Sequence, residues 1–514
     1  MTRTRLPLVS LLFLTATAKA ADWPTFGHDP QRTGWAYEES MLSRENVSTL
    51  ELKWKTKVKN EFRTLSALTV PVVAVGVPTL KGVRNVVYVA GSADHVFALD
   101  TETGEVLWTR SFKSYVAPKN SGYQGTFLCP NGITATPTID RSTSILYVIA
   151  ADGALYGLDL GSGKIRFGPA QFVAPFAKSW SLNLIDGVVY TTLTQGCGGG
   201  LSGFYSMDVR NSHHPSLYQL LLSTTDTAGI WGRGGPVAGK NGRIYGSTAD
   251  GNFDPVSGEF SNTVIAASLR NLDLVDYYTP ENWRDLNHRD LDLGSASPVW
   301  FSWKNYNLLA SGAKEGIVYL LDADALGDKD HQTTLFTTGR LGNDQRTFEQ
   351  HGIWGGLSSC RDDEGQTWLF VPMWGPVSEA APKFPLTNGA NPHGSIMAFK
   401  VASGRGSNKP VLEPIWVSGD FNLPDPVVIA NGVVFALSTG ENAKQTGSTD
   451  ATRMENTRPA VLYGLDAQNG KVLYNSGDAM KSWVHFSGLS IAEGHVYAVD
   501  HDSQVYCFGL KGKP

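Results

Sequence analysis

Two carboxylates stand close together in the segment HRDLDLGSASPVW (residues 288–300), which holds Asp290 and Asp292. A carboxylate beside a bound cation stays ionised near neutral pH and is suited to accept a proton. We expect only one of the two to face a common site. Asp250, in the segment STADGNFDP, offers a hard oxygen ligand of the kind that calcium prefers. The alternative for all three is a structural role in a loop or turn.

Other catalytic patterns are weak or missing in the sequence. His213 and His214 are adjacent, and adjacent residues seldom ligate one metal ion. The sequence has no GxSxG, HExxH or phosphate-binding Gly-Lys motif, and no CxxCH to attach a haem. Functions that depend on these motifs are therefore disfavoured.

The four cysteines stand at positions 129, 197, 360 and 507, and none has the CxxC spacing of a zinc site. In an oxidising compartment they allow up to two disulfides, with three possible pairings. We predict a bridge between Cys129 and Cys197, because both lie beside loop-forming glycine or proline. The alternative is that either one is a buried free thiol.

One pattern recurs eight times along the chain. Each copy has two alternating apolar runs around a turn of Gly, Asp or Ser, and the first copy ends in Asp100, Gly104 and Trp108. The Asp can accept backbone hydrogen bonds in this turn, the Gly takes a positive φ, and the Trp covers the seam to the next unit. The copies lie at residues 87–108, 145–167, 188–209, 243–269, 308–326, 368–404, 433–474 and 495–510.

Each copy is typical of an antiparallel hairpin with one buried face. Such hairpins cannot bury their faces alone, but they bury them against one another when they are arranged radially as the blades of a propeller. The sequence therefore predicts an all-β, eight-bladed β-propeller that forms a single domain over residues 21–514. Residues 46–58 have no hairpin partner nearby, and we expect them to close the ring by pairing with the last blade.

The first twenty residues are typical of an export signal. Arg3 and Arg5 precede a short apolar run, and Ala18-Lys19-Ala20 is a small-x-small cleavage site. The run is too short to span a bilayer and no later segment is long enough, so we expect a periplasmic or secreted protein that does not span the membrane. A net charge of −5 argues against a nucleic-acid partner.

The Asp-x-x-x-Gly-x-x-x-Trp ending resembles the tryptophan-docking repeat of quinoprotein dehydrogenases that bind pyrroloquinoline quinone (PQQ). The stretch WPTFGHDPQRTGW (residues 23–35) and the ending QVYCFGL are also similar to that family. The resemblance extends over almost the whole chain after the export signal. It implies a PQQ-binding-like eight-bladed β-propeller that oxidises a small alcohol or polyol with PQQ and Ca²⁺. Electrons would pass to a separate acceptor such as a cytochrome.

The resemblance also implies roles for individual residues. Trp231 falls on the tryptophan that stacks on the quinone, and Asp250 falls on an asparagine that binds the metal ion. Asp290 falls on the catalytic base, with Asp292 as the alternative. Lys314, which we expect at the start of a strand, falls on the basic residue that contacts the quinone, and Trp354 falls where packing is the favoured role.

Two departures from the family pattern favour a different function. The family's vicinal Cys-Cys is replaced by the single Cys129, and Gln195 stands in the segment where the family has a metal-binding glutamate. The metal site would then consist of Asp250, Gln195 and cofactor oxygens. The alternative function is a non-catalytic propeller that binds a protein or polymer, because the fold does not determine the function.

Overall fold

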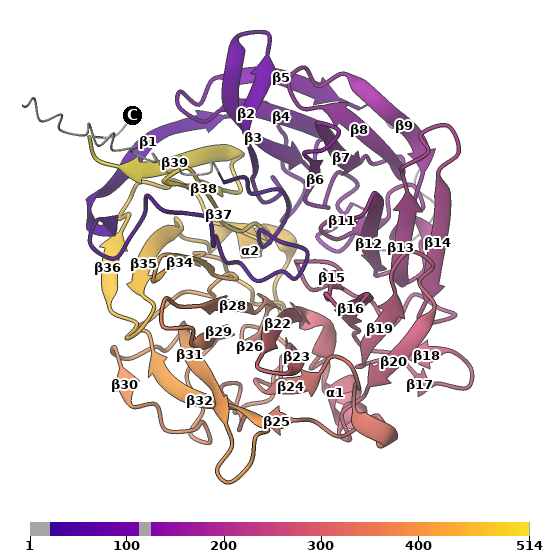
Figure 1. Cartoon of the computed structure of the whole chain (residues 1–514), viewed down its shortest axis with the longest axis vertical. Coiled ribbons are helices and arrows are strands. Elements are labelled where there is room, and N and C mark those ends of the chain that lie inside the picture. The colour runs from indigo at the N-terminus through magenta and orange to yellow at the C-terminus, as the bar shows by residue number, and fades with distance from the viewer. Residues whose placement is uncertain (1–20, 113–124, 513–514) are drawn as a thin grey trace, which may run out of the picture.

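The computed structural model describes residues 21–112 and 125–512, so the predicted export signal lies outside the described residues. Within these residues eight sheets, antiparallel except for the pairing of β30 (Leu386–Thr387) with β32 (Pro410–Val417), are arranged in a ring around one axis (Figure 1). The eight-bladed propeller predicted from the sequence is confirmed. Each of the eight repeats supplies the second and third strands of one blade. The prediction of one buried face is wrong for these strands: both faces are buried against neighbouring blades, because nearly all their residues are apolar or small.

The first four blades follow the chain in order, and each has its strands in the sequence order of the chain. Their strands are β2 (Val72–Thr79), β3 (Gly82–Gly91), β4 (His95–Asp100) and β5 (Val106–Ser111); β6 (Thr138–Asp140), β7 (Ile145–Ile149), β8 (Ala154–Asp159) and β9 (Ile165–Gln171); β10 (Lys178–Ser179), β11 (Asn183–Ile185), β12 (Val188–Thr194), β13 (Gly203–Asp208) and β14 (Ser216–Leu221); β15 (Val237–Ala238), β16 (Arg243–Ser247), β19 (Val264–Ser268) and β20 (Leu274–Tyr278).

The last four blades complete the ring. Their strands are β22 (Val299–Trp303), β23 (Tyr306–Gly312), β24 (Val318–Asp322) and β25 (Phe336–Thr337); β26 (Gly352–Ile353), β28 (Ser358–Arg361), β29 (Thr367–Trp374), β30 (Leu386–Thr387), β31 (Gly394–Ser403) and β32 (Pro410–Val417); β33 (Val428–Ala430), β34 (Val433–Ser438), β35 (Val461–Asp466) and β36 (Val472–Asn475); β37 (Ser490–Ala492), β38 (His495–Val499), β39 (Gln504–Leu510) and β1 (Leu50–Lys57).

Ring closure joins the two ends of the described chain. Strand β1 pairs antiparallel with β39, with Leu50 opposite Leu510 and Lys57 opposite Gln504 (Figure 1). The prediction that residues 46–58 complete the last blade is confirmed. This pairing removes the open edge that β39 would otherwise present.

Tryptophans seal the outer seams between blades. The Trp108 indole N–H donates to the carbonyl of Leu160 at 2.9 Å, and its ring lies over Gly163 of the next blade. A Cβ at Gly163 would lie 2.6 Å from the ring, and its φ of +64° also favours glycine. Trp54 packs in the same way over Gly104 and donates to the carbonyl of Thr101.

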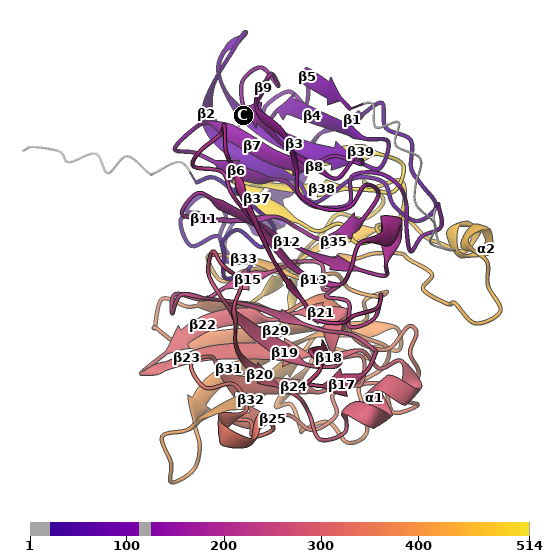
Figure 2. The same ribbon diagram turned by 90° about the vertical axis from the view of Figure 1, so that its right-hand side faces the viewer.

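The remaining elements are short and lie in the connections between blades. They are the helices α1 (Trp283–Arg289) and α2 (Asp450–Glu455), the 3-10 turns η1 (Val47–Thr49), η2 (Cys197–Gly199), η3 (Leu293–Ser295) and η4 (Asp328–Asp330), and the paired strands β17 (Phe253–Asp254), β18 (Glu259–Phe260), β21 (Ala296–Ser297) and β27 (Gly355–Gly356). Both α-helices lie on the same side of the ring (Figure 2). In the described part of the chain, no helix has the length and apolar character that a membrane crossing requires.

Candidate functional site

Corresponding hairpins of three successive blades carry polar residues to the same end of the ring. Gln195 follows β12, Asp250 follows β16, and Lys314 lies in the turn between β23 and β24. Each hairpin connects the second and third strands of its blade, so the three turns emerge on the same side of the propeller. Lys314 lies in a turn rather than at the start of a strand, and it is only 3% exposed.

Helix α1 carries the two remaining carboxylates to this site. The helix ends at Arg289, and Asp290 follows as its C-cap with left-handed dihedrals (φ 55°, ψ 43°). The backbone N–H of Leu291 then donates to the carbonyl of Leu286 at 2.9 Å. The chain then turns so that the Asp292 carboxylate accepts the backbone N–H of Asp250 at 3.2 Å. The expectation that only one of Asp290 and Asp292 faces the site is wrong. Residues two apart share a face even on an extended chain, and here the left-handed turn brings both inward.

Lys314 lies between these two carboxylates. Its Nζ is 2.6 Å from Asp290 Oδ1 and 2.8 Å from Asp292 Oδ2, and it also donates to the Asp290 carbonyl at 3.0 Å. One carboxylate oxygen from each of Asp250, Asp290 and Asp292 lies within 4.8 Å of the others. Three carboxyl groups therefore crowd around a single ammonium, and the ionised Asp290 and Asp292 already outnumber it.

Crowding of these charges alters their titration. Burial, followed by the charges of Asp292 and Asp290, raises the pKa of Asp250 to about 9. Burial and the Asp292 charge raise the pKa of Asp290 to about 6, although Lys314 opposes the shift. Burial acts to raise the pKa of Asp292, but Lys314 and hydrogen bonds outweigh it and the pKa is lowered. The cluster would gain from a further cation, because a cation would favour the charged form of every carboxylate.

Aromatic rings form another wall of the site. Trp231, in the connection between β14 and β15, makes an edge contact with Trp354 at 5.3 Å, and Trp354 stacks on Trp374 at 4.6 Å. The Lys314 Nζ lies 5.3 Å from the centre of the Trp231 ring and 5.0 Å from that of Trp354. Trp354 has the packing role that we expected, but it also lines the site.

All five sequence-predicted site residues line one cavity of about 440 Å³, namely Trp231, Asp250, Asp290, Lys314 and Gln195. This volume lies within the range of about 300–1,000 Å³ that is common for small-molecule sites. The Gln195 side-chain oxygen is buried and has no hydrogen-bond partner among the described residues. An unpartnered acceptor of this kind is free to ligate a cation.

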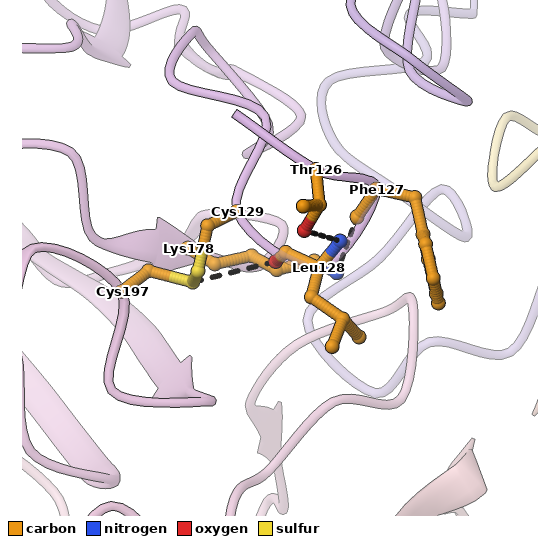
Figure 3. The surroundings of a disulfide bond; sticks show 6 residues. All are labelled: Thr126, Phe127, Leu128, Cys129, Lys178 and Cys197. Atoms are coloured by element: carbon orange, nitrogen blue, oxygen red, sulfur yellow. Dashed lines mark hydrogen bonds between the residues drawn. A yellow bond between two sulfur atoms is a disulfide. The ribbon is translucent and has the colours of Figure 1, made fainter. Parts of the chain in front are cut away.

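A disulfide holds one rim of the cavity. Cys129 is bonded to Cys197, as predicted, with 5.5 Å between their Cα atoms (Figure 3). The bridge fastens the loop that carries Phe127 and Leu128, both of which line the cavity. The Leu128 carbonyl oxygen lies 3.3 Å from the Cys197 sulfur. The disulfide atoms themselves are buried, so Phe127 and Leu128 form this part of the wall.

The sequence did not predict two features of the cavity. Asp292 was considered only as an alternative base, but it is the buried member of the carboxylate cluster. Lys178, at the start of β10, was not singled out, although it is buried in the cavity wall. A lysine immediately before the SWSLNL run, in which polar and apolar residues alternate, was the only signal in the sequence.

Comparison with known proteins gives a match in the first part of the chain. Residues 23–174 match the PQQ family described as the glucose/ethanol/alcohol dehydrogenase β-propeller domain. Over 151 residues the chain is 28% identical to a quinohemoprotein alcohol dehydrogenase of Comamonas testosteroni. This match covers 29% of the chain and 18% of that relative's length.

Comparison of whole structures extends the likeness in fold. The crystal structure of the Comamonas testosteroni enzyme aligns with a TM-score of 0.59 at 14% identity, over 98% of this chain and 83% of the other. A europium-containing methanol dehydrogenase aligns with a TM-score of 0.61 at 12% identity, over 95% of this chain and 98% of the other. The resemblance seen in the sequence is confirmed: the chain has the eight-bladed fold of the PQQ dehydrogenases, and its residues 23–174 match their propeller domain.

Proposed function

We propose that this protein is a quinoprotein-type dehydrogenase that oxidises an alcohol or polyol with PQQ and a divalent cation. One observation carries the proposal. Trp231, Asp250, Asp290 and Lys314 come from separate connections of the chain, yet they line a single cavity at one end of the propeller. The match of residues 23–174 to the PQQ family supports the same chemistry.

The donor set fits a hard cation. Asp250, Asp292 and Gln195 offer oxygen atoms to the cavity, and oxygen ligands are those that calcium prefers. Lys314 pairs with Asp290 and Asp292, and the crowding keeps Asp250 protonated near neutral pH; a divalent ion would favour the ionised form of Asp250 and so recruit it as a third carboxylate. The carboxylates take the place of the family's glutamate and asparagine, so the loss of the glutamate at Gln195 does not remove the anionic character of the site.

Asp290 is the better placed of the paired carboxylates to act as a base. Its side chain is 49% exposed, whereas that of Asp292 is 8% exposed, so a substrate can reach Asp290 more readily. With a pKa of about 6 it is largely ionised at neutral pH and can take the proton of a substrate hydroxyl. PQQ, when bound, would supply the oxidant that accepts the hydrogen and two electrons from the carbinol carbon.

Lys314 positions this base. Burial alone would lower its pKa, but the charges of Asp292 and Asp290 outweigh burial and raise the pKa above its ordinary value. The ammonium therefore stays protonated and holds Asp290 at 2.6 Å. Trp231 offers an aromatic surface beside Lys314 on which a planar quinone would stack.

The proposal extends to location and electron transfer. The sequence of residues 1–20 and the Cys129–Cys197 disulfide both suit an exported protein, since disulfides persist in oxidising compartments. The sequence has no CxxCH motif for a covalent haem, so a separate acceptor such as a cytochrome would receive the electrons.

Reconstitution tests the proposal. The exported protein is incubated with PQQ and Ca²⁺, and its absorption spectrum, metal content and dye-linked oxidation of an alcohol and polyol panel are measured. Asp290→Asn should retain the quinone but lose oxidation, and Trp231→Ala should lose the quinone. Asp363→Asn, a change at an exposed aspartate, is the matched control. If the wild-type protein neither retains PQQ nor reduces the dye, a non-catalytic binding scaffold replaces this proposal.

A further inference from the structure

A buried cation in the cavity wall has no anionic partner among the residues that the structure describes. Lys178 is 4% exposed and lines the same cavity as the carboxylate cluster. Among residues 21–112 and 125–512, its Nζ donates a hydrogen bond to the Phe127 carbonyl oxygen at 3.4 Å (Figure 3). The rings of Trp180 and Phe486 lie 5.3 and 6.0 Å from its Nζ. These contacts compensate only part of the cost of burying an ammonium.

Other buried cations of the propeller are compensated. Arg32 donates three hydrogen bonds of 2.8 to 2.9 Å, to Thr25 and to the carbonyls of Phe26 and Leu182. Lys314 has two carboxylates, as described above. Lys178 is buried to a similar extent as Arg32 and Lys314, but its one hydrogen bond among the described residues is longer and is made to a neutral carbonyl.

The other buried arginines have carboxylate partners of their own, and these carboxylates do not contact Lys178. Arg233 pairs with Asp425, and Arg453 pairs with Glu441 at 3.3 Å. Burial lowers the pKa of Lys178 to about 7, and no charged group of the described residues contributes to offset it. The ammonium of Lys178 therefore has no anionic partner among the described residues.

We propose that Lys178 is an anion-recognition residue and that it pairs with a carboxylate of the ligand that occupies the main cavity. The space that Lys178 shares with Arg233 and His485 is only about 40 Å³, too small for an organic acid, so the ligand must enter through the main cavity of about 440 Å³. That cavity has its surplus negative charge at the Asp250 cluster and its unpartnered positive charge at Lys178. A ligand with a carboxylate at one end complements this arrangement.

Two kinds of molecule offer that carboxylate. One is the quinone cofactor, since PQQ bears carboxylates, and the other is a substrate such as a hydroxy acid. This inference rests on the proposed function only in its choice of these two molecules. Binding of either one is measurable without turnover, so the inference can hold or fail separately from the oxidation reaction.

Calorimetry distinguishes the two sources. PQQ is titrated into the metal-free protein in one arm, and glycolate, with neutral ethylene glycol as comparison, into the PQQ-treated protein in the other. We expect Lys178→Met to weaken one of the carboxylate ligands about 10- to 100-fold, the loss that removal of a charged hydrogen-bond partner produces. Loss in the PQQ arm assigns the anion to the quinone, and loss confined to glycolate assigns it to the substrate.

Proton uptake separates charge pairing from a merely structural effect. At pH 8, carboxylate binding to the wild-type protein should take up about one proton, because a paired Lys178 regains its ordinary basicity. Lys178→Met should take up none, and Lys240→Met, which changes a lysine outside this cavity, should behave as wild type. The inference is overturned if neither ligand binds the wild-type protein, or if both bind Lys178→Met as tightly as wild type.

Discussion

The unpartnered charge of Lys178 should make the ligand-free protein less stable at neutral pH than at alkaline pH. Burial lowers its pKa from 10.5 to about 7 in the folded state, so between these values the unfolded chain binds a proton that the folded chain does not. The penalty is complete below pH 7 and disappears as pH rises through 10.5. Linkage gives a penalty of about 4 kcal/mol at pH 7 and about 2 kcal/mol at pH 9.

The change Lys178→Met removes this penalty while it keeps a side chain of similar length. The variant should therefore be more stable than wild type at pH 7, and its advantage should shrink by about 2 kcal/mol at pH 9. Urea unfolding of both ligand-free proteins, followed by tryptophan fluorescence at the two pH values, measures the difference. Packing effects of methionine cancel in this comparison because they are the same at both pH values. An advantage that does not change with pH, or a variant that is less stable at pH 7, would refute the reasoning.

Three further predictions concern the base, the rim and the seams. Asp290→Asn should lower dye-linked alcohol oxidation by about 10²–10⁴-fold with little change in melting temperature, since the amide cannot accept a proton; an active variant would exclude Asp290 as the base. Cys129→Ser opens a bridge across 68 positions, which should cost about 4 kcal/mol in urea unfolding; unchanged stability would contradict this. Gly163→Ala combines a φ of +64° with a contact of 2.6 Å to Trp108, so it should destabilise more than Gly406→Ala, which has a φ of +68° and open space. Equal losses would show that the Trp108 contact adds nothing.

The repeat architecture could be predicted because its signals are local. An Asp, a Gly and a Trp spaced four residues apart define one turn and one seam, and the same spacing is legible wherever it recurs. In the structure Asp100 accepts the N–H of Glu102 at 2.9 Å and Gly104 has a φ of +71°, as the turn requires. The partner of residues 46–58 was also predictable, because a propeller leaves one blade to be completed from the opposite end of the chain.

The arrangement of the site could be predicted only in part. The resemblance nominated Asp290 and Lys314, but their pairing depends on the left-handed end of α1, a backbone feature that residue types alone do not specify. The same left-handed turn brings Asp292 to Lys314, so its place in the cluster could not be predicted either. The Cys129–Cys197 pairing remained one of several possibilities, because the distance between cysteines in a folded chain does not follow from their spacing in the sequence.

Lys178 shows what residue types alone cannot reveal. On an exposed strand edge a lysine is an ordinary solvated charge, and nothing in its neighbours excludes that role. Only the assembly of the ring places it 4% exposed beside Phe127 and without a carboxylate in the described residues. Its unmet charge and the excess carboxylates at Asp250 arise from different blades, yet they line one cavity. The assembly of the blades therefore brings opposite charges to one cavity, and these charges favour different groups of one ligand.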